Sequence, residues 1–267
     1  MSLPLALMKA GLGLAALAAA ASSHAAIAYD QNVTPGVIFG TGNTNGSFTV
    51  DSANGVELGL RGKLRHGPTG QPANIYNSNG NGTYSFAAGV APTQVFPTGV
   101  WSFEWAINTD TSGTSGVKLG ALTYLLGIDN DPSLGTSFFT FDPIHAVNPG
   151  NPGFGTVWWD HAMGDNTTTA ATKQVATDAN DYASQIAALN VAQQSWKASW
   201  YMPGYDPTVD GTYNFYLVAF DAAGAPVART DIQIIVGQGG TAVPEPGSLA
   251  LAGLALFGLV AARRRRG

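Results

Sequence analysis

The distribution of apolar and polar residues divides the chain into three parts. One uninterrupted apolar run covers residues 10–21, and a second apolar run, with Ser248 near its start, covers residues 247–262, close to the two ends. Between them, apolar and polar residues alternate repeatedly with a period of two, which is typical of β-strands with one buried face. The pattern therefore predicts a β-rich body flanked by two segments of a different kind.

The alternation is clearest in residues 100–108, where Trp101, Phe103, Trp105 and Ile107 would share one face of a strand. Spacers rich in Gly, Asn, Asp and Pro separate this segment from the other candidates. The other predicted strands are residues 46–51, 55–64, 83–86, 119–128, 137–141, 156–159, 195–201, 212–221 and 227–236.

The end of the body predicts a β-hairpin, because residues 212–221 and 227–236 are separated by a short turn around Gly224. One segment, residues 178–189, has helical spacing instead, with Asp178 or Asn180 as its N-cap. Many short antiparallel strands with one short helix predict a mainly β fold, an antiparallel β-sandwich of the Ig-like or jelly-roll-like kind.

The N-terminal segment, residues 1–25, has the features of a signal peptide. Lys9 precedes an apolar run of 12 residues, which is too short to span a bilayer. Small residues at Ser23 and Ala25 provide a cleavage context, so we expect cleavage between Ala25 and Ala26. The chain is therefore expected to be exported through the inner membrane.

The C-terminal segment predicts a transmembrane helix over residues 247–267. Its apolar run of 16 residues would be roughly 24 Å long as a helix. The four arginines that follow, Arg263, Arg264, Arg265 and Arg266, would stop transfer and stay in the cytoplasm. The predicted organisation is thus a signal peptide, an extracellular domain at residues 26–237, a linker at residues 238–246, and this tail.

The linker ends in Val243, Pro244, Glu245 and Pro246. Together with the apolar helix and the arginine cluster, this sequence resembles the PEP-CTERM sorting signal of Gram-negative bacteria. The resemblance implies recognition by exosortase, a transient membrane anchor, and delivery to the cell surface or the extracellular space. Residues 124–132, 139–143 and 206–220 also resemble a recurrent type of PEP-CTERM ectodomain, which implies an extracellular β-domain without known catalytic residues.

The composition of the body limits its partners. The chain has no cysteine, and charged residues make up only 11% of it. Lys9 and the four tail arginines account for five of the 12 basic residues, and Glu245 for one of the 17 acidic ones, which leaves the body near −9. This charge argues against nucleic acid or anionic lipid as a partner.

Few residues are placed to carry out catalysis. His66, His145 and His161 remain after signal removal, without a metalloprotease, nucleophile or phosphate-loop motif beside them. Glu104 lies in an aromatic strand, where a general acid is conceivable, but a half-exposed strand residue is the more economical interpretation. We therefore expect no catalytic residues.

One acidic group predicts a weak metal site. Asp129, Asp131 and Asp142 offer hard oxygen ligands that suit Ca²⁺. The EF-hand pattern is absent, however, and Asp before Pro also serves as an ordinary turn residue. Residues 160–165 form a second, weaker acidic loop; apart from these sites we expect no cofactor.

Aromatic residues suggest contact with sugars. Five aromatic residues can stack on sugar rings if they are exposed: Trp158, Trp159, Trp196, Trp200 and Tyr201. Large aromatic residues at strand spacing are mostly buried, however, so a place in the core is the favoured interpretation. Because adjacent strand residues point to opposite faces, one of Trp158 and Trp159 is expected to be more exposed.

These features support three hypotheses about function. The first is a non-enzymatic surface or extracellular-matrix protein associated with exopolysaccharide, biofilm or floc, with signal peptidase and exosortase as processing partners. The second is a carbohydrate-binding, lectin-like adhesin, and the third is a secreted hydrolase. An exposed row of tryptophans would favour the second, and a cleft with two paired carboxylates would favour the third.

Overall fold

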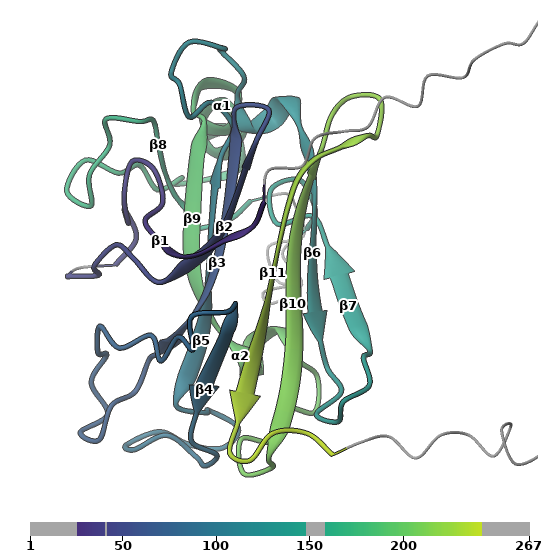
Figure 1. Ribbon diagram of the computed structural model, residues 1–267. Helices are drawn as coiled ribbons and strands as arrows, with labels where there is room; N and C mark the ends of the chain where they lie inside the picture. The colour runs from purple at the N-terminus through teal and green to yellow at the C-terminus, as the bar shows by residue number, and fades with distance from the viewer. Residues whose placement is uncertain (1–25, 41, 148–157, 242–267) are drawn as a thin grey trace, which may run out of the picture.

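The computed structural model describes residues 26–40, 42–147 and 158–241, and its strands form two sheets packed face to face (Figure 1). The six-stranded sheet has the order β1-β2-β3-β5-β9-β8, and every neighbouring pair in it is antiparallel. Its strands are β1 (Ala28–Gln31), β2 (Phe48–Ala53), β3 (Val56–Leu64), β5 (Trp101–Asn108), β9 (Val191–Lys197) and β8 (Ala162–Gly164).

The second sheet has five strands in the order β4-β11-β10-β6-β7. Its neighbours are antiparallel except for β4 and β11, which pair in parallel. The strands are β4 (Thr83–Phe86), β11 (Pro226–Val236), β10 (Gly211–Phe220), β6 (Thr123–Asp129) and β7 (Phe138–Phe141). The mainly β, sandwich-like fold predicted from the alternating pattern is confirmed.

The predicted C-terminal hairpin is present as β10 and β11. The two strands pair from Gly211–Val236 to Phe220–Pro226, and the amide of Asp221 donates to the carbonyl of Ala225 across the turn. Gly224 has a φ of +77°, a left-handed conformation that glycine adopts without a steric penalty. Turn chemistry and alternation thus specify this hairpin locally.

The core lies between the sheets and is rich in aromatic rings. Trp101, Phe103, Trp105 and Ile107 on β5 are all buried and face the second sheet, as the alternation predicts. The rings of Phe103 and Phe215 are 4.8 Å apart between centroids and so join β5 to β10. Such ring pairs add to the free energy gained by burying apolar area.

The predicted helix is α1 (Ala179–Ala188). The Asp178 carboxylate accepts hydrogen bonds from the amides of Asn180 and Asp181, which otherwise lack partners in the first helical turn. Tyr182 is buried in the core and donates to the carbonyl of Ile144. The helix and Asp178 as its cap are confirmed.

Three predicted strands differ from the structure. Residues 195–201 contain the end of β9 and then a short helix, α2 (Ala198–Tyr201), because the chain turns away from the sheet after Lys197. Residues 119–121 form a 3₁₀ turn before β6 rather than the start of that strand. Of residues 156–159, only Trp158 and Trp159 are described, and they are not in a strand.

Two short strands, β1 and β8, were not predicted. Both lie at the edges of the six-stranded sheet, and each is too short to show a clear alternation. Their pairing with β2 and β9 is decided by tertiary contacts rather than by local pattern.

The face of the six-stranded sheet that points away from the second sheet is covered by loops, which lie on that side of the molecule in Figure 1. Val33, Phe48, Val50 and Ala106 form a small apolar cluster beneath the loop that leads from β1 to β2. This loop covers the middle of β3 and β5. The outer face is therefore partly buried. It differs from the outer face of a common antiparallel sheet, which is in contact with solvent.

The predicted segments at the two ends lie largely outside the described residues. These are the signal peptide at residues 1–25 with Ala25 at its cleavage site, the motif Val243–Pro246, and the tail at residues 247–267. Of the predicted linker, residues 238–241 are described and are held against the sandwich. The amide of Gly240 donates to Thr212 Oγ1, and the carbonyl of Thr241 accepts from Leu134.

Candidate functional site

Asp129 and Asp131, which we predicted as metal ligands, stabilise a loop. Asp129 Oδ1 accepts from the amides of Asp131 at 3.1 Å and Ser137 at 2.7 Å, and Oδ2 faces the amide and side chain of Asn214. Asp131 in turn accepts from the amide of Ser133 at 2.9 Å. Both carboxylates thus satisfy donors of the loop between β6 and β7.

Asp142 lies at the other end of the same hairpin. Phe138 pairs with Asp129, whereas Phe141 pairs with Leu126, so residue 142 is several residues away from Asp129 along β6. Its carboxylate accepts from the amides of Ile144, His145 and Tyr124.

The three carboxylates therefore do not converge, and the shared Ca²⁺ site predicted from their spacing is wrong. The hairpin register is the physical reason, since it separates residues that are close in sequence. Across the described ranges, no group of three or more Asp, Glu, His or Cys side chains is placed to hold a metal ion.

The second acidic loop also has a structural role. His161 is fully buried, its Nε2 lies 2.7 Å from the carbonyl of Pro143, and its ring stacks on Trp159. Burial lowers the pKa of His161 to about 3, so the imidazole is neutral at physiological pH. Asp165 accepts from Thr167 in an exposed turn.

The two tryptophans predicted as glycan contacts belong to the core or pack against it. Trp159 is buried and donates from Nε1 to the carbonyl of Ala146, so its ring cannot reach a sugar. Trp158 is half-buried beside the core and donates to the carbonyl of Ala176 at 3.3 Å. Trp158 is the more exposed of the two, as expected, and a glycan contact through it stays a prediction.

A different site lies on the outer face of the six-stranded sheet, at Glu104. In the β3–β5 ladder, Arg61 is directly opposite Glu104 and Lys63 is directly opposite Ser102. Directly opposed residues share a face of the sheet, and so do residues two apart on one strand. The register therefore brings two cations to one carboxylate from strands that are 43 residues apart in sequence.

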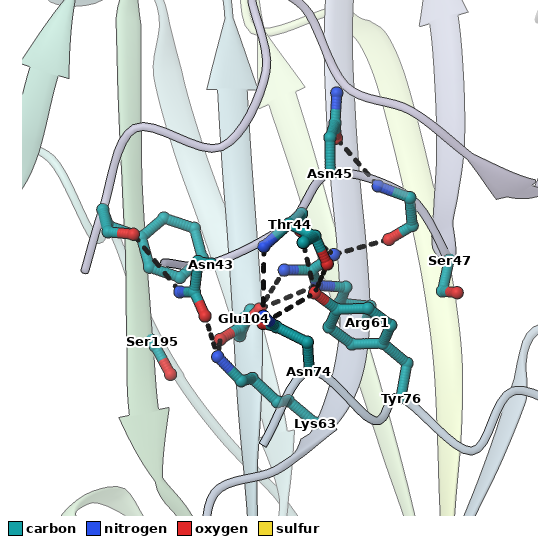
Figure 2. Close-up of polar contacts among 12 residues, drawn as sticks. Asn43, Thr44, Asn45, Ser47, Arg61, Lys63, Asn74, Tyr76, Glu104 and Ser195 are labelled. Carbon is teal, nitrogen blue, oxygen red and sulfur yellow. Dashed lines mark hydrogen bonds and ion pairs between the residues drawn. The ribbon is translucent and has the colours of Figure 1, made fainter. Parts of the chain in front are cut away.

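This cluster is buried and tightly bonded (Figure 2). Arg61 Nη2 and Nε lie 2.6 and 2.7 Å from Glu104 Oε2, and the Lys63 amine is 3.6 Å from Oε1. The side chains of Arg61 and Glu104 are both fully buried, and the Lys63 side chain is only 7% exposed. Glu104 is thus neither half-exposed nor available as a general acid.

The loop before β2 covers the cluster on its solvent side. Arg61 Nη1 donates to the carbonyls of Thr44 and Gly46, and Lys63 donates to the Asn43 side chain. The Arg61 guanidinium also lies against two rings, 4.1 Å from the centroid of Phe48 and 3.8 Å from that of Tyr76. These contacts replace the water that a buried guanidinium loses.

The charges in this cluster do not balance. Burial lowers the pKa of Lys63, the neighbouring Arg61 lowers it further, and Glu104 opposes both effects. A single carboxylate thus holds two cations, and its removal would leave both of them buried without a counter-charge.

The cationic face continues beyond the buried cluster. Arg65 follows Lys63 just past the end of β3, and its Nη1 lies 3.3 Å from Ser195 Oγ on β9. Lys197 on β9 is directly opposite Ser102, so it shares the face with Lys63. Arg65 and Lys197 lie over the ring of Trp200, at 5.3 and 4.8 Å from its centroid.

Sequence reasoning missed this basic site because its members come from distant segments. The spacing of Arg61, Lys63 and Arg65 at alternate positions was a signal that all three share one face. Nothing local, however, indicated that β5 and β9 would bring Glu104 and Lys197 to the same place.

The fold and the site together define a class of protein: a β-sandwich whose outer face carries a buried ionic cluster bordered by two half-buried cations. No helix within the described ranges is both long and apolar enough to cross a membrane.

Residues 242–266 match the family model for the PEP-CTERM protein-sorting motif. The chain therefore carries this sorting signal, as its Pro-Glu-Pro sequence and arginine cluster indicated. The motif indicates an exported protein that is targeted to exosortase and passes through a membrane-anchored stage on its way to the cell surface. No curated protein matches the chain significantly.

Proposed function

We propose that the β-sandwich is a non-enzymatic surface or extracellular-matrix protein that acts by contact and associates with exopolysaccharide in a biofilm or floc. The observation that carries this proposal is the use of the ionisable side chains: those that resemble catalytic groups are engaged in the scaffold. Glu104 is the clearest case, because both of its neighbouring cations are buried with it.

The histidines support the same conclusion. His161 is buried among aromatic rings with a strongly lowered pKa, and His145 Nδ1 lies 3.0 Å from the carboxylate of Asp142, which also binds two backbone amides of its own turn. His66 Nδ1 faces the carbonyl of Gly70 at 3.3 Å. None of these contacts pairs a histidine with a serine or threonine hydroxyl, as nucleophilic catalysis would require.

A pocket of about 190 Å³ at one end of the sandwich also bears on the hydrolase hypothesis. Among its lining residues, Asp206 is the one carboxylate, and Asp206 Oδ1 accepts from the amide and hydroxyl of Thr208. Glycoside hydrolysis uses two carboxylates on either side of the bond that is cleaved. This pocket therefore favours a binding or structural role over glycoside hydrolysis.

The sorting motif supports a particular maturation route. Signal peptidase would cleave between Ala25 and Ala26, the tail would hold the chain in the inner membrane, and exosortase would act near Val243–Pro246. Intact-mass measurement of the protein from its native host tests this route. A mature form that begins near Ala26 and lacks Arg263–Arg266 is expected; a dominant form that retains the arginines would contradict it.

Deletion of the gene in the native host tests the role in the matrix. Reduced cell aggregation and reduced retention of polysaccharide are expected, with recovery when the wild-type gene is restored. A normal matrix in the deletion strain, together with turnover by the purified protein in a glycosidase or esterase screen, would overturn the proposal in favour of a secreted hydrolase.

A further inference from the structure

The cations of the body are concentrated on one face of the molecule. The described residues contain seven Lys and Arg, since the other five of the 12 are Lys9 and the four tail arginines. Four of the seven, Arg61, Lys63, Arg65 and Lys197, belong to the outer face of β3, β5 and β9 or its immediate continuation. A body with a net charge near −9 therefore carries a local excess of positive charge.

Two of these cations are partly exposed at the surface. Arg65 and Lys197 are half-buried, and within the described part of the chain no carboxylate forms an ion pair with either. The internal segments that are not described, residue 41 and residues 148–157, contain no Asp or Glu. Neither cation therefore has an ion-pair partner among the described residues, although the charge of the buried Glu104 acts on Arg65.

The charges around the pair act on each other. Burial lowers the pKa of Arg65 and the charge of Glu104 opposes this effect, whereas burial and then the charge of Arg65 both lower the pKa of Lys197. An anion bound between them would relieve this repulsion, which makes the arrangement complementary to negative charge.

An aromatic ring lies at the same place. Trp200 is 45% exposed, whereas the other five tryptophans are buried or half-buried. Arg65 and Lys197 both contact its ring, so the indole helps to hold the two cations in position and still has apolar surface left. Positive charge beside an exposed indole suits a sugar ring that carries a carboxylate.

We propose that Arg65, Lys197 and Trp200 form a binding site for an acidic polysaccharide, a chain of sugar rings bearing carboxylates. This inference rests on the proposed function and specifies its ligand class. The buried pair Arg61 and Lys63 adds positive potential behind the site, because Glu104 neutralises only one of them. A polyuronate carries about one charge per sugar, and the acidic body repels it less than it repels the more densely charged nucleic acids.

Binding of the purified full chain to polygalacturonate tests the proposal, with neutral dextran and single-stranded DNA as comparison polymers. The double variant Arg65→Gln, Lys197→Gln should bind polygalacturonate about tenfold more weakly than the wild type. Trp200→Ala should weaken the same binding by several-fold, and added salt should weaken binding by the wild type.

Matched controls separate the site from general charge and folding effects. Lys118→Gln, Lys173→Gln removes the same charge elsewhere on the body and should leave binding unchanged. Phe138→Ala removes an exposed aromatic ring from β7 and should also have no effect. Melting temperatures within a few degrees of the wild type establish that each variant is folded.

Three results would overturn the inference: no binding of polygalacturonate by the wild type, an equal loss in the Lys118, Lys173 control, or tighter binding of DNA than of polygalacturonate. A matrix defect in the deletion strain together with any of these results would leave the proposed function standing while this site falls. A normal matrix in the deletion strain, combined with binding that depends on this site, would support the binding site and contradict the proposed role in the matrix.

Discussion

The two faces of the six-stranded sheet are built from the same strands but are stabilised by different physics. The inner face presents Trp101, Phe103 and Trp105 to the second sheet, where aromatic rings pack against each other. The outer face presents Arg61 and Glu104 from the same two strands, and their charges are almost as well buried.

The comparison shows that burial alone does not define a hydrophobic core. On the inner face, burial stabilises the fold directly, because each apolar side chain leaves water. On the outer face, burial is tolerated because the ion pair, the loop carbonyls and the rings of Phe48 and Tyr76 replace the lost water. On the inner face, the free energy of unfolding should therefore fall with the amount of apolar surface that a substitution removes. On the outer face, it should fall steeply when one charged partner is removed and the other stays buried.

The largest expected effect is the loss of Glu104. Glu104→Gln keeps the size of the side chain but leaves Arg61 and Lys63 buried without a negative partner, so we expect a loss of about 3–5 kcal/mol in the free energy of unfolding. Denaturant titration monitored by tryptophan fluorescence measures it.

The exposed pair Arg229–Asp231 on β11 provides the control for this prediction, since both of its side chains are more than 40% exposed. Asp231→Asn should lower the free energy of unfolding by less than about 1 kcal/mol. Equal effects of the two substitutions would show that burial of the Glu104 cluster has no energetic consequence.

A truncation on the inner face should have a comparable but less uniform effect. Leu60 is fully buried on β3, next in sequence to Arg61. Leu60→Ala removes apolar contacts and leaves a cavity, so we expect a loss of about 2–5 kcal/mol in the free energy of unfolding. The same denaturant titration applies, and a loss below about 1 kcal/mol would mean that the core around Leu60 is not tightly packed.

Low pH should lower the free energy of unfolding through His161, whose ring packs against the aromatic residues of the inner face. The pKa of this histidine is lowered to about 3 by burial, whereas an unfolded chain has the ordinary value near 6.5. The unfolded state therefore binds the additional proton, and the stability due to neutral His161 is lost as the pH falls from about 6.5 towards 3. Between pH 7 and pH 5 this amounts to about 2 kcal/mol.

Thermal unfolding of the wild type and of His161→Gln at several pH values checks this prediction. The variant should lose less stability than the wild type over the same pH range, because glutamine does not titrate. Parallel pH profiles for the two proteins would contradict the assignment.

The smallest expected loss of stability is at the N-cap of α1, which lies on neither face of the sheet and gives a reference value for the other substitutions. Asp178→Ala removes the N-cap of α1 and leaves the amides of Asn180 and Asp181 without their acceptor. A loss of about 1 kcal/mol is expected, and Asp178→Asn should retain most of the stability because the amide oxygen can still accept. Equal losses in the two variants would argue against the capping role.

Local patterns predicted the regular elements well. Alternation located β3, β5, β10 and β11, and the capping residue Asp178 located the start of α1. These features depend on contacts between neighbours in sequence and on a buried face with a fixed period, which a single sequence displays directly.

The candidate sites were predicted poorly, for the same reason in each case. Asp129 and Asp142 are close in sequence, yet the register of the β6–β7 hairpin places them at opposite ends. Trp159 was a candidate sugar contact with the core as the favoured alternative, and it is packed among the rings of the core. Spacing along a chain gives proximity only within an element; between elements, register and packing decide it.

The sequence by itself therefore determined the β-rich body, its hairpin, its helix, and the sorting motif at residues 242–266, because each is encoded in consecutive residues. The tertiary structure alone decided that Arg61 and Lys63 meet Glu104, and that Arg65 and Lys197 meet Trp200. Those contacts join β3, β5 and the segment from β9 to α2, which are far apart in the chain. They form only when the sheet aligns its strands, so no local pattern contains them.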